Sequence, residues 1–354
     1  MATPLFPTTV IGSLPRPAWV KDLILDRKEG RLSEKEAEQW LDHAVPVALA
    51  LQERAGVEEV TDGEWRRESY VKVFAERVIG FEKDINPSGG LPYPGAVAPI
   101  EYHRPIAADE IRFLRSRTER RIKATLPSPF IIGRRMWHPE LSTKVYPTRA
   151  SLMNDCVPVI RKEIDALKEA GADTIQLDEP WLSVMVDPTF REKEGVEDVD
   201  YEMDLCVDML NQALDGITGI TTAIHLCHAH FERQHGSEGP YDLIMPALNK
   251  IRVEIICMEY ATPVAGGMES LAQFPGETKL GLGCVDHCDP HVETPEEIVD
   301  RVEKAMEYVD KERIILHPDC GFSPSVQNPM DLDEAYLKLK SMSEASRILR
   351  EKYD

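Results

Sequence analysis

The chain has 354 residues, 42% hydrophobic and 29% charged, which is enough for a sizeable core in one large domain or two smaller ones. Its 62 acidic and 41 basic residues give a net charge of −21, which argues against nucleic acid or an anionic membrane as a partner. We find neither a signal peptide nor an apolar run of the roughly 20 residues that a membrane span needs. The 7 scattered cysteines fit a reducing compartment, so we expect a cytoplasmic protein.

Short β-branched runs alternate with amphipathic helical patterns along the chain, which predicts βα units and a parallel sheet. The predicted strands are residues 8–12, 57–61, 130–133, 174–177, 221–226, 253–258, 279–283 and 313–317. The clearest helical patterns cover residues 33–55, 149–170, 201–215 and 294–309, and two begin with capping boxes, at Ser33 and Thr294. These repeats predict an α/β fold, a (β/α)8 TIM barrel that forms a single domain over residues 1–354.

An open, doubly wound sheet is the alternative, but it would need a glycine-rich phosphate loop after the first strand, and GSLPRP is not one. Two long segments fall outside the repeat. Residues 82–120 predict an excursion between the second and third strands, such as a hairpin over the barrel mouth. Residues 186–200 are acidic and predict an exposed loop.

Polar side chains follow the predicted strands again and again. They are Ser13, Asp62, Glu64, Asp178, Glu179, His225, Cys227, Glu259, Asp286, His287, Asp319 and Cys320. Any one of them alone is as well explained by a helix cap or a solvated loop acid. Because catalytic groups of a barrel come from the carboxyl ends of its strands, we expect the set to converge on one mouth.

His225, Cys227, Glu259 and Cys320 each come just after a β-branched run. Two thiolates, an imidazole and a carboxylate form a ligand set that suits Zn²⁺. The alternative is a set of buried structural cysteines beside a core histidine. The placement of all four at strand ends favours the metal.

The ordered segments TTVIGS, DGEW, QLDEP, H-x-C, I-x-M-E and PDCG resemble the C-terminal catalytic domain of the cobalamin-independent methionine synthase family. The resemblance covers about residues 4–345, with no second, N-terminal barrel, so the chain is similar to the short, single-barrel "core" members. It implies Zn²⁺ on the same four residues. His228 falls on the opposite face of the strand from His225 and Cys227, and His230 lies past its end, so we expect supporting or structural roles for both.

The resemblance also implies a substrate pocket. Homocysteine would be held at Ser13, Glu64 and Asp178, with Ile11 in the same segment as Ser13. The carboxylates suit an ammonium group, and the serine hydroxyl and N–H suit a carboxylate.

The family has an aspartate followed two residues later by a histidine after the seventh strand, and that histidine is its candidate proton donor. The aspartate matches Asp286, but Cys288 stands at the histidine position. We therefore take Asp286 with its neighbour His287 as the candidate catalytic residues.

The function that the resemblance implies is a zinc-dependent transfer of a methyl group to the thiol of homocysteine, giving methionine. The donor is methylcobalamin, a corrinoid protein or methyltetrahydrofolate. We expect methylcobalamin to work better, because the second barrel is absent and Arg135 stands close to the position of the family's folate-binding tryptophan. The alternatives are a zinc enzyme that alkylates another thiol such as coenzyme M, a zinc hydrolase, and a regulatory barrel without activity.

Overall fold

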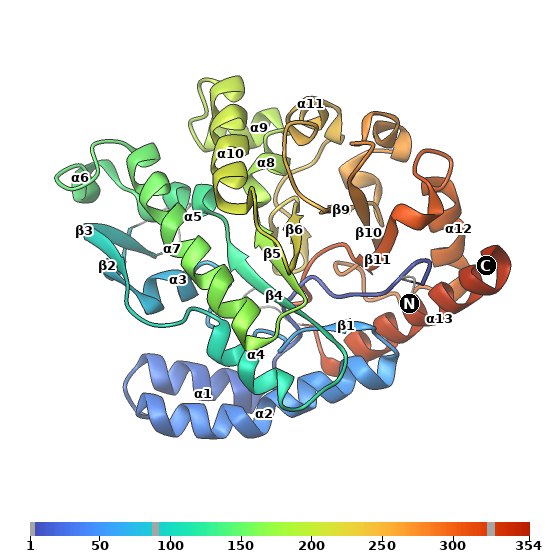
Figure 1. Cartoon of the computed structure of the whole chain (residues 1–354), viewed down its shortest axis with the longest axis horizontal. Helices are drawn as coiled ribbons and strands as arrows, with labels where there is room; N and C mark the ends of the chain where they lie inside the picture. The colour runs from blue at the N-terminus through green and yellow to red at the C-terminus, as the bar shows by residue number, and fades with distance from the viewer. Residues whose placement is uncertain (1–3, 87–91, 324–329) are drawn as a thin grey trace.

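The computed structural model describes residues 4–86, 92–323 and 330–354. A 7-stranded parallel sheet in the order β1-β4-β5-β6-β9-β10-β11 lies at the centre of the molecule (Figure 1). Its strands are β1 (Glu59–Val60), β4 (Arg121–Pro127), β5 (Thr174–Asp178), β6 (Thr221–His225), β9 (Ile255–Glu259), β10 (Lys279–Val285) and β11 (Ile314–Pro318).

The segment at Thr8 and Thr9 closes this sheet into a barrel. Thr8 forms a parallel bridge with Leu316 of β11, and Thr9 forms one with Glu59 of β1. These two residues therefore occupy the place of an eighth strand between the two edge strands. The predicted TIM barrel is confirmed, although the predicted strand at 8–12 is reduced to two bridging residues.

The helices lie around the outside of the strands (Figure 1). They are α1 (Ala18–Lys28), α2 (Glu34–Ala55), α3 (Lys72–Arg77), α4 (Ala108–Arg115), α5 (Pro129–Met136), α6 (Pro139–Ser142), α7 (Arg149–Ala170), α8 (Pro180–Val184), α9 (Pro188–Lys193), α10 (Val199–Leu214), α11 (Met245–Leu248), α12 (Pro295–Ala305) and α13 (Leu332–Tyr353). Short 3-10 turns are η2 (Tyr241–Leu243), η3 (Pro263–Ala265), η4 (Met268–Gln273) and η5 (Lys311–Arg313). No helix among the described residues is both long and apolar enough to cross a membrane.

The four clearest helical predictions are confirmed as α2, α7, α10 and α12. Ser33 caps α2 and Thr294 caps α12, each through the predicted capping box. The predicted strand at 130–133 is wrong, because those residues lie in α5 and the strand before them is β4. The predicted loop at 186–200 is also wrong in part, because α9 and the start of α10 lie within it.

The excursion at 82–120 contains most of an antiparallel hairpin formed by β2 (Val78–Asn86) and β3 (Tyr93–Tyr102), followed by α4. Residues 87–91 of this segment lie outside the described residues. The hairpin packs beside α3, α5, α6 and α7. Its position over the barrel mouth stays a prediction.

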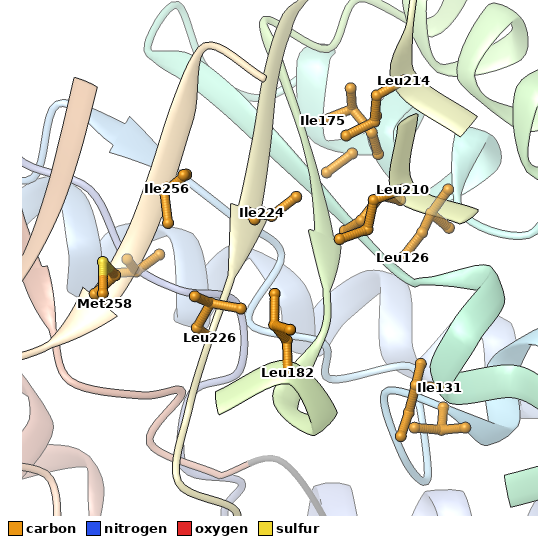
Figure 2. Packing of buried hydrophobic residues seen from close by; sticks show 14 of the residues in the cluster. Leu126, Ile131, Ile175, Leu182, Leu210, Leu214, Ile224, Leu226, Ile256 and Met258 are labelled. Carbon is orange, nitrogen blue, oxygen red and sulfur yellow. The ribbon is translucent and has the colours of Figure 1, made fainter. Parts of the chain in front are cut away.

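Alternate residues of the strands face opposite sides of the barrel wall, as the period of a strand requires. Ile175, Ile224 and Ile256 from three adjacent strands belong to the large apolar cluster between the sheet and its helices, which includes Leu210 and Leu214 of α10 (Figure 2). A separate, smaller cluster comprises Ile11, Ala223, Ile255 and Cys257. The sheet is thereby fixed on its outer face, while polar groups gather where the strands end.

Candidate active site

Several predicted site residues lie where neighbouring parallel strands end. Asp178 is the last residue of β5, His225 is the last of β6 and Glu259 is the last of β9. Cys227 is the second residue after the end of β6, and Cys320 is the second residue after the end of β11. Since the carboxyl ends of parallel strands meet at one mouth of a barrel, these segments converge there.

One group of candidate ligands comprises Cys227, His230, Glu259 and Cys320, whose ligand atoms all lie within 4.8 Å of one another. The hydrogen bond from the Cys320 thiol lowers the pKa of Cys227 to about 6, and the same contact raises that of Cys320 well above its usual value. One thiolate is therefore favoured even without an ion. Two cysteines, an imidazole and a carboxylate at these separations fit a tetrahedral Zn²⁺ site.

His225, which was predicted as a ligand, lies outside this group of atoms. Its Nδ1 is 3.3 Å from Oδ1 of Asp178. Its Nε2 is buried and has no hydrogen-bond partner among the described residues. His225 is the last residue of β6, two positions before Cys227, and the lone pair of its unpartnered Nε2 could bind a metal ion.

Two further histidines hold Glu259. The Nδ1 of His228 lies 2.8 Å from Oε2 of Glu259, and its backbone N–H donates to the same oxygen at 3.2 Å. His230 bonds the other oxygen through Nε2. Burial alone would raise the pKa of Glu259, but the His230 and His228 rings hold it well below its usual range. His228 thus contacts Glu259, and its supporting role stays a prediction, whereas His230 is itself placed as a candidate ligand.

His230 follows β6 by five residues, beyond the reach of a strand-periodicity argument. The sequence signal that could have identified it is the density of histidine and cysteine in IHLCHAH. Its placement depends on a tight hairpin formed by β7 (His230–Phe231) and β8 (Gln234–His235).

The Glu64 carboxyl is buried beside Thr125, whose hydroxyl donates to Oε1 at 2.8 Å. Its Oε2 has no hydrogen-bond partner among the described residues. Burial raises the pKa of Glu64 to about 7, with the Asp178 charge adding to the shift and Arg67 opposing it. The free oxygen is an acceptor suited to a substrate ammonium group.

The remaining predicted pocket residues lie around the same end of the barrel. Gln176 donates through Nε2 to Oδ1 of Asp178 at 2.8 Å and to the carbonyl of Ile11 at 3.0 Å, which ties these two segments together. Ser13 accepts from the backbone N–H of Ser323 at 3.2 Å. The three predicted residues Ile11, Ser13 and Asp178 are buried.

Asp286 and His287, the predicted catalytic pair, follow β10 directly. The Asp286 carboxylate accepts from the backbone N–H of Cys288 at 2.7 Å. His287 lies with its ring centroid 4.1 Å from that of His230. Burial first, and then the nearby His230, hold the pKa of His287 well below its usual value, so its ring is neutral at physiological pH.

Comparison with known proteins gives one consistent result. Residues 6–347 match the family described as "Cobalamin-independent synthase, Catalytic domain". A methionine synthase of Saccharolobus solfataricus is 32% identical over 353 residues, covering 98% of this chain and 96% of the relative. One from Pyrococcus abyssi is 30% identical and covers 100% and 96%.

A solved structure of a B12-independent methionine synthase from Shewanella sp. W3-18-1, in complex with selenomethionine, has a similar fold. It superimposes with a TM-score of 0.81 at 26% identity, and the match covers 98% of both chains. The likeness therefore extends over nearly the whole barrel.

Proposed function

We propose that this chain, which belongs to the family of cobalamin-independent synthase catalytic domains, is a zinc-dependent enzyme that methylates homocysteine to methionine. Its membership makes it a methyltransferase, so the hydrolase and regulatory alternatives fall away.

The observation that carries the proposal is the grouping of Cys227, Glu259 and Cys320 with a histidine at the mouth of the barrel. His225 and His230 are the two candidates for that histidine. A Zn²⁺ ion held there would supply a Lewis acid that favours the thiolate form of a thiol at neutral pH. The role of the chain is to hold the ligands close together and to keep Glu259 ionised through His228.

The amino-acid end of homocysteine is assigned to the buried carboxylates. The unpartnered Oε2 of Glu64 and the nearby Asp178 would accept hydrogen bonds from its ammonium group. Ser13 would donate to its carboxylate. Holding both charged ends fixes the direction of the sulfur and so aligns it for in-line attack on the methyl carbon.

We assign proton transfer to the segment after β10. The Nδ1 of His287 is buried without a hydrogen-bond partner among the described residues, and its neutral ring can carry a proton between neighbours. Asp286 holds this segment in place through the backbone of Cys288. With methyltetrahydrofolate as donor, the pair would pass a proton to the nitrogen of the departing tetrahydrofolate, whereas departing cob(I)alamin needs no proton.

For the donor we favour methylcobalamin, free or on a corrinoid protein, over methyltetrahydrofolate. The guanidinium carbon of Arg134 lies 3.8 Å from the centroid of the Trp181 ring, and that of Arg135 lies 5.3 Å from it. Trp137 is also engaged, because its Nε1 donates to the carbonyl of Tyr146 at 2.9 Å. These aromatic and cationic groups already have partners, which leaves less for a pterin glutamate to bind.

The test is methionine formation by purified, zinc-loaded protein with homocysteine and each donor separately. We expect turnover with methylcobalamin and poor turnover with methyltetrahydrofolate. Efficient use of methyltetrahydrofolate with none of methylcobalamin would overturn the donor assignment. Absence of methionine with both donors, in protein that holds zinc, would overturn the homocysteine assignment as well.

Coenzyme M remains the second candidate thiol, in the same assay. Its sulfonate would meet the carboxylates of Glu64 and Asp178, which would repel it. We therefore expect homocysteine to be preferred by a large factor in kcat/KM.

A cytoplasmic location, expected from the scattered cysteines, also stays a prediction and is tested by fractionation of the producing cells.

A further inference from the structure

A second group of metal-ligating side chains lies next to the proposed zinc ligands. The ligand atoms of His230, His235 and Cys288 all lie within 4.8 Å of one another. The side chains of His235 and Cys288 take no part in the methyl transfer proposed above. They are therefore available to bind a ligand of their own.

A tight hairpin brings the two histidines together. His230 of β7 pairs directly with His235 of β8, and their ring centroids are 4.6 Å apart. The two residues of the turn, Glu232 and Arg233, have positive φ values of 49° and 63°. This is the backbone of a type I′ turn, which usually takes Asn or Gly, so the chain accepts strain to hold these rings opposite each other.

Arg233 also fixes the hairpin against the segment that carries the cysteine. Its Nε donates to the carbonyl of Cys288 at 3.0 Å, and its two terminal nitrogens bind Glu334 of α13 at 2.8 and 2.6 Å. A bidentate Arg–carboxylate pair is a rigid contact. The hairpin and Cys288 are thus held in one arrangement by a residue that is not itself a ligand.

The donor atoms of this group point at one another. The Cys288 sulfur lies 3.7 Å from Nδ1 of His230 and 3.6 Å from Nε2 of His287. The Nδ1 atoms of His235 and His287 are buried without hydrogen-bond partners among the described residues. Buried nitrogens without partners are costly, and a cation would use the lone pair of the His235 nitrogen.

The ring of His230 lies between the two groups, with Nε2 towards Glu259 and Nδ1 towards Cys288. If His225 completes the first site through its free Nε2, His230 is left for the second. Two imidazoles and one thiolate form a borderline-soft donor set, which suits Zn²⁺, Co²⁺ or Ni²⁺ and not Mg²⁺ or Ca²⁺.

We propose that His230, His235 and Cys288 bind a second transition-metal ion beside the zinc site, with His287 lining it. The inference goes beyond the proposed methyl transfer, because nothing in that reaction requires a second ion.

The experiment is a titration of metal-free, reduced full-length protein with Zn²⁺ against a chromophoric chelator, with total zinc checked by elemental analysis. We expect about two equivalents per chain for the wild type and about one for Cys288→Ser and for His235→Gln. His291→Gln is the matched control, since His291 is an exposed histidine of the same loop that contacts Glu297. It should keep about two.

Loading with Co²⁺ gives a second readout, because each thiolate ligand contributes charge-transfer absorption that Cys288→Ser should reduce. Circular dichroism establishes that each variant is folded. About one equivalent in the wild type, or no loss of zinc in either Cys288→Ser or His235→Gln, would overturn the second site. So would loss of both equivalents in Cys288→Ser. Cys320→Ser should lose the first equivalent only, and retention of both in that variant would contradict the zinc ligands of the proposed function instead.

Discussion

Glu64 is a buried carboxyl in a left-handed backbone conformation, with φ of 56°. Such a conformation is uncommon for a residue with a side chain and is often found at functional sites. Burial raises its pKa to about 7, so a substantial fraction is neutral at physiological pH. The folded protein then binds more protons than the unfolded chain between pH 4.5 and about 7, and its stability falls as pH rises through that window.

The first prediction concerns the pH dependence of homocysteine binding. A substrate ammonium group needs the ionised form of Glu64, so affinity should rise as pH increases through about 7. We expect about a tenfold change in KM for homocysteine between about pH 6 and pH 8, following the ionised fraction. Glu64→Gln should bind more weakly and lose most of this dependence. The same steep profile in the variant would place the titrating group elsewhere.

The second prediction concerns Asp178. Asp178→Asn should raise KM for homocysteine about tenfold or more, because it removes a charge-assisted hydrogen bond to the ammonium group. Zinc content should stay at the wild-type value. Elemental analysis and steady-state kinetics check this together. Loss of zinc in Asp178→Asn would instead mean that Asp178 orients His225, whose Nδ1 lies 3.3 Å from Oδ1 of Asp178.

Cys227, Glu259 and Cys320 could be placed at one mouth from sequence because each lies within two residues of a strand end. His230 could not, because it lies beyond the strand, after an irregular segment in which Ala229 has a positive φ of 53°. The geometry of that segment carries no signal in hydrophobic periodicity. Residues beyond regular strands therefore cannot be placed from hydrophobic periodicity.

At the scale of elements, α4 has no side-chain cap of its own, and α7 supplies one. Glu163 of α7 accepts hydrogen bonds from the backbone N–H groups of Ile106, Ala107 and Ala108 at 2.7–2.9 Å. The Tyr102 hydroxyl donates to the same carboxylate at 2.8 Å. A single buried carboxylate thereby joins the end of the β2–β3 hairpin to α4.

The third prediction follows from that carboxylate. Glu163→Ala should lower the free energy of unfolding by about 3 kcal/mol, because it leaves several buried N–H groups unsatisfied. Glu163→Gln should cost less, since an amide oxygen can still accept. Glu169→Ala, an exposed position on the same helix, should have little effect. Equal denaturation midpoints for Glu163→Ala and Glu169→Ala would contradict the capping role.

The strand that sequence reasoning misplaced shows the limit at this scale. PFIIG is a short apolar run, and such a run cannot be assigned to strand or helix by periodicity alone. Ser128 caps it through the N–H of Ile131, and Pro129 at the first position favours a helix. The real strand, β4, contains Lys123, whose ammonium group is buried and donates to the carbonyl of Val10 at 2.9 Å. A strand that contains a buried lysine does not form a continuous apolar run, so it cannot be recognised from the hydrophobic pattern of the sequence.

At the scale of the whole molecule, the proposed zinc ligands join distant parts of the barrel. Cys227 follows β6, Glu259 ends β9, and Cys320 follows β11, with β10 between the last two. An ion bound to all three would tie β11 to β9 and β6, from which β10 separates it in the sheet. Because the unfolded chain has no such preformed site, metal binding stabilises the folded state.

The fourth prediction is that a chelator lowers the apparent thermal midpoint by a few degrees. Saturation at about one hundred times Kd is worth about 2.7 kcal/mol, and a chain of this length shifts by only a few degrees for that free energy. Added Zn²⁺ should restore the midpoint. Cys320→Ser, already lacking a ligand, should respond much less to the chelator than the wild type. A wild-type midpoint that does not move while elemental analysis shows the zinc removed would mean that the ion does not tie the strands together.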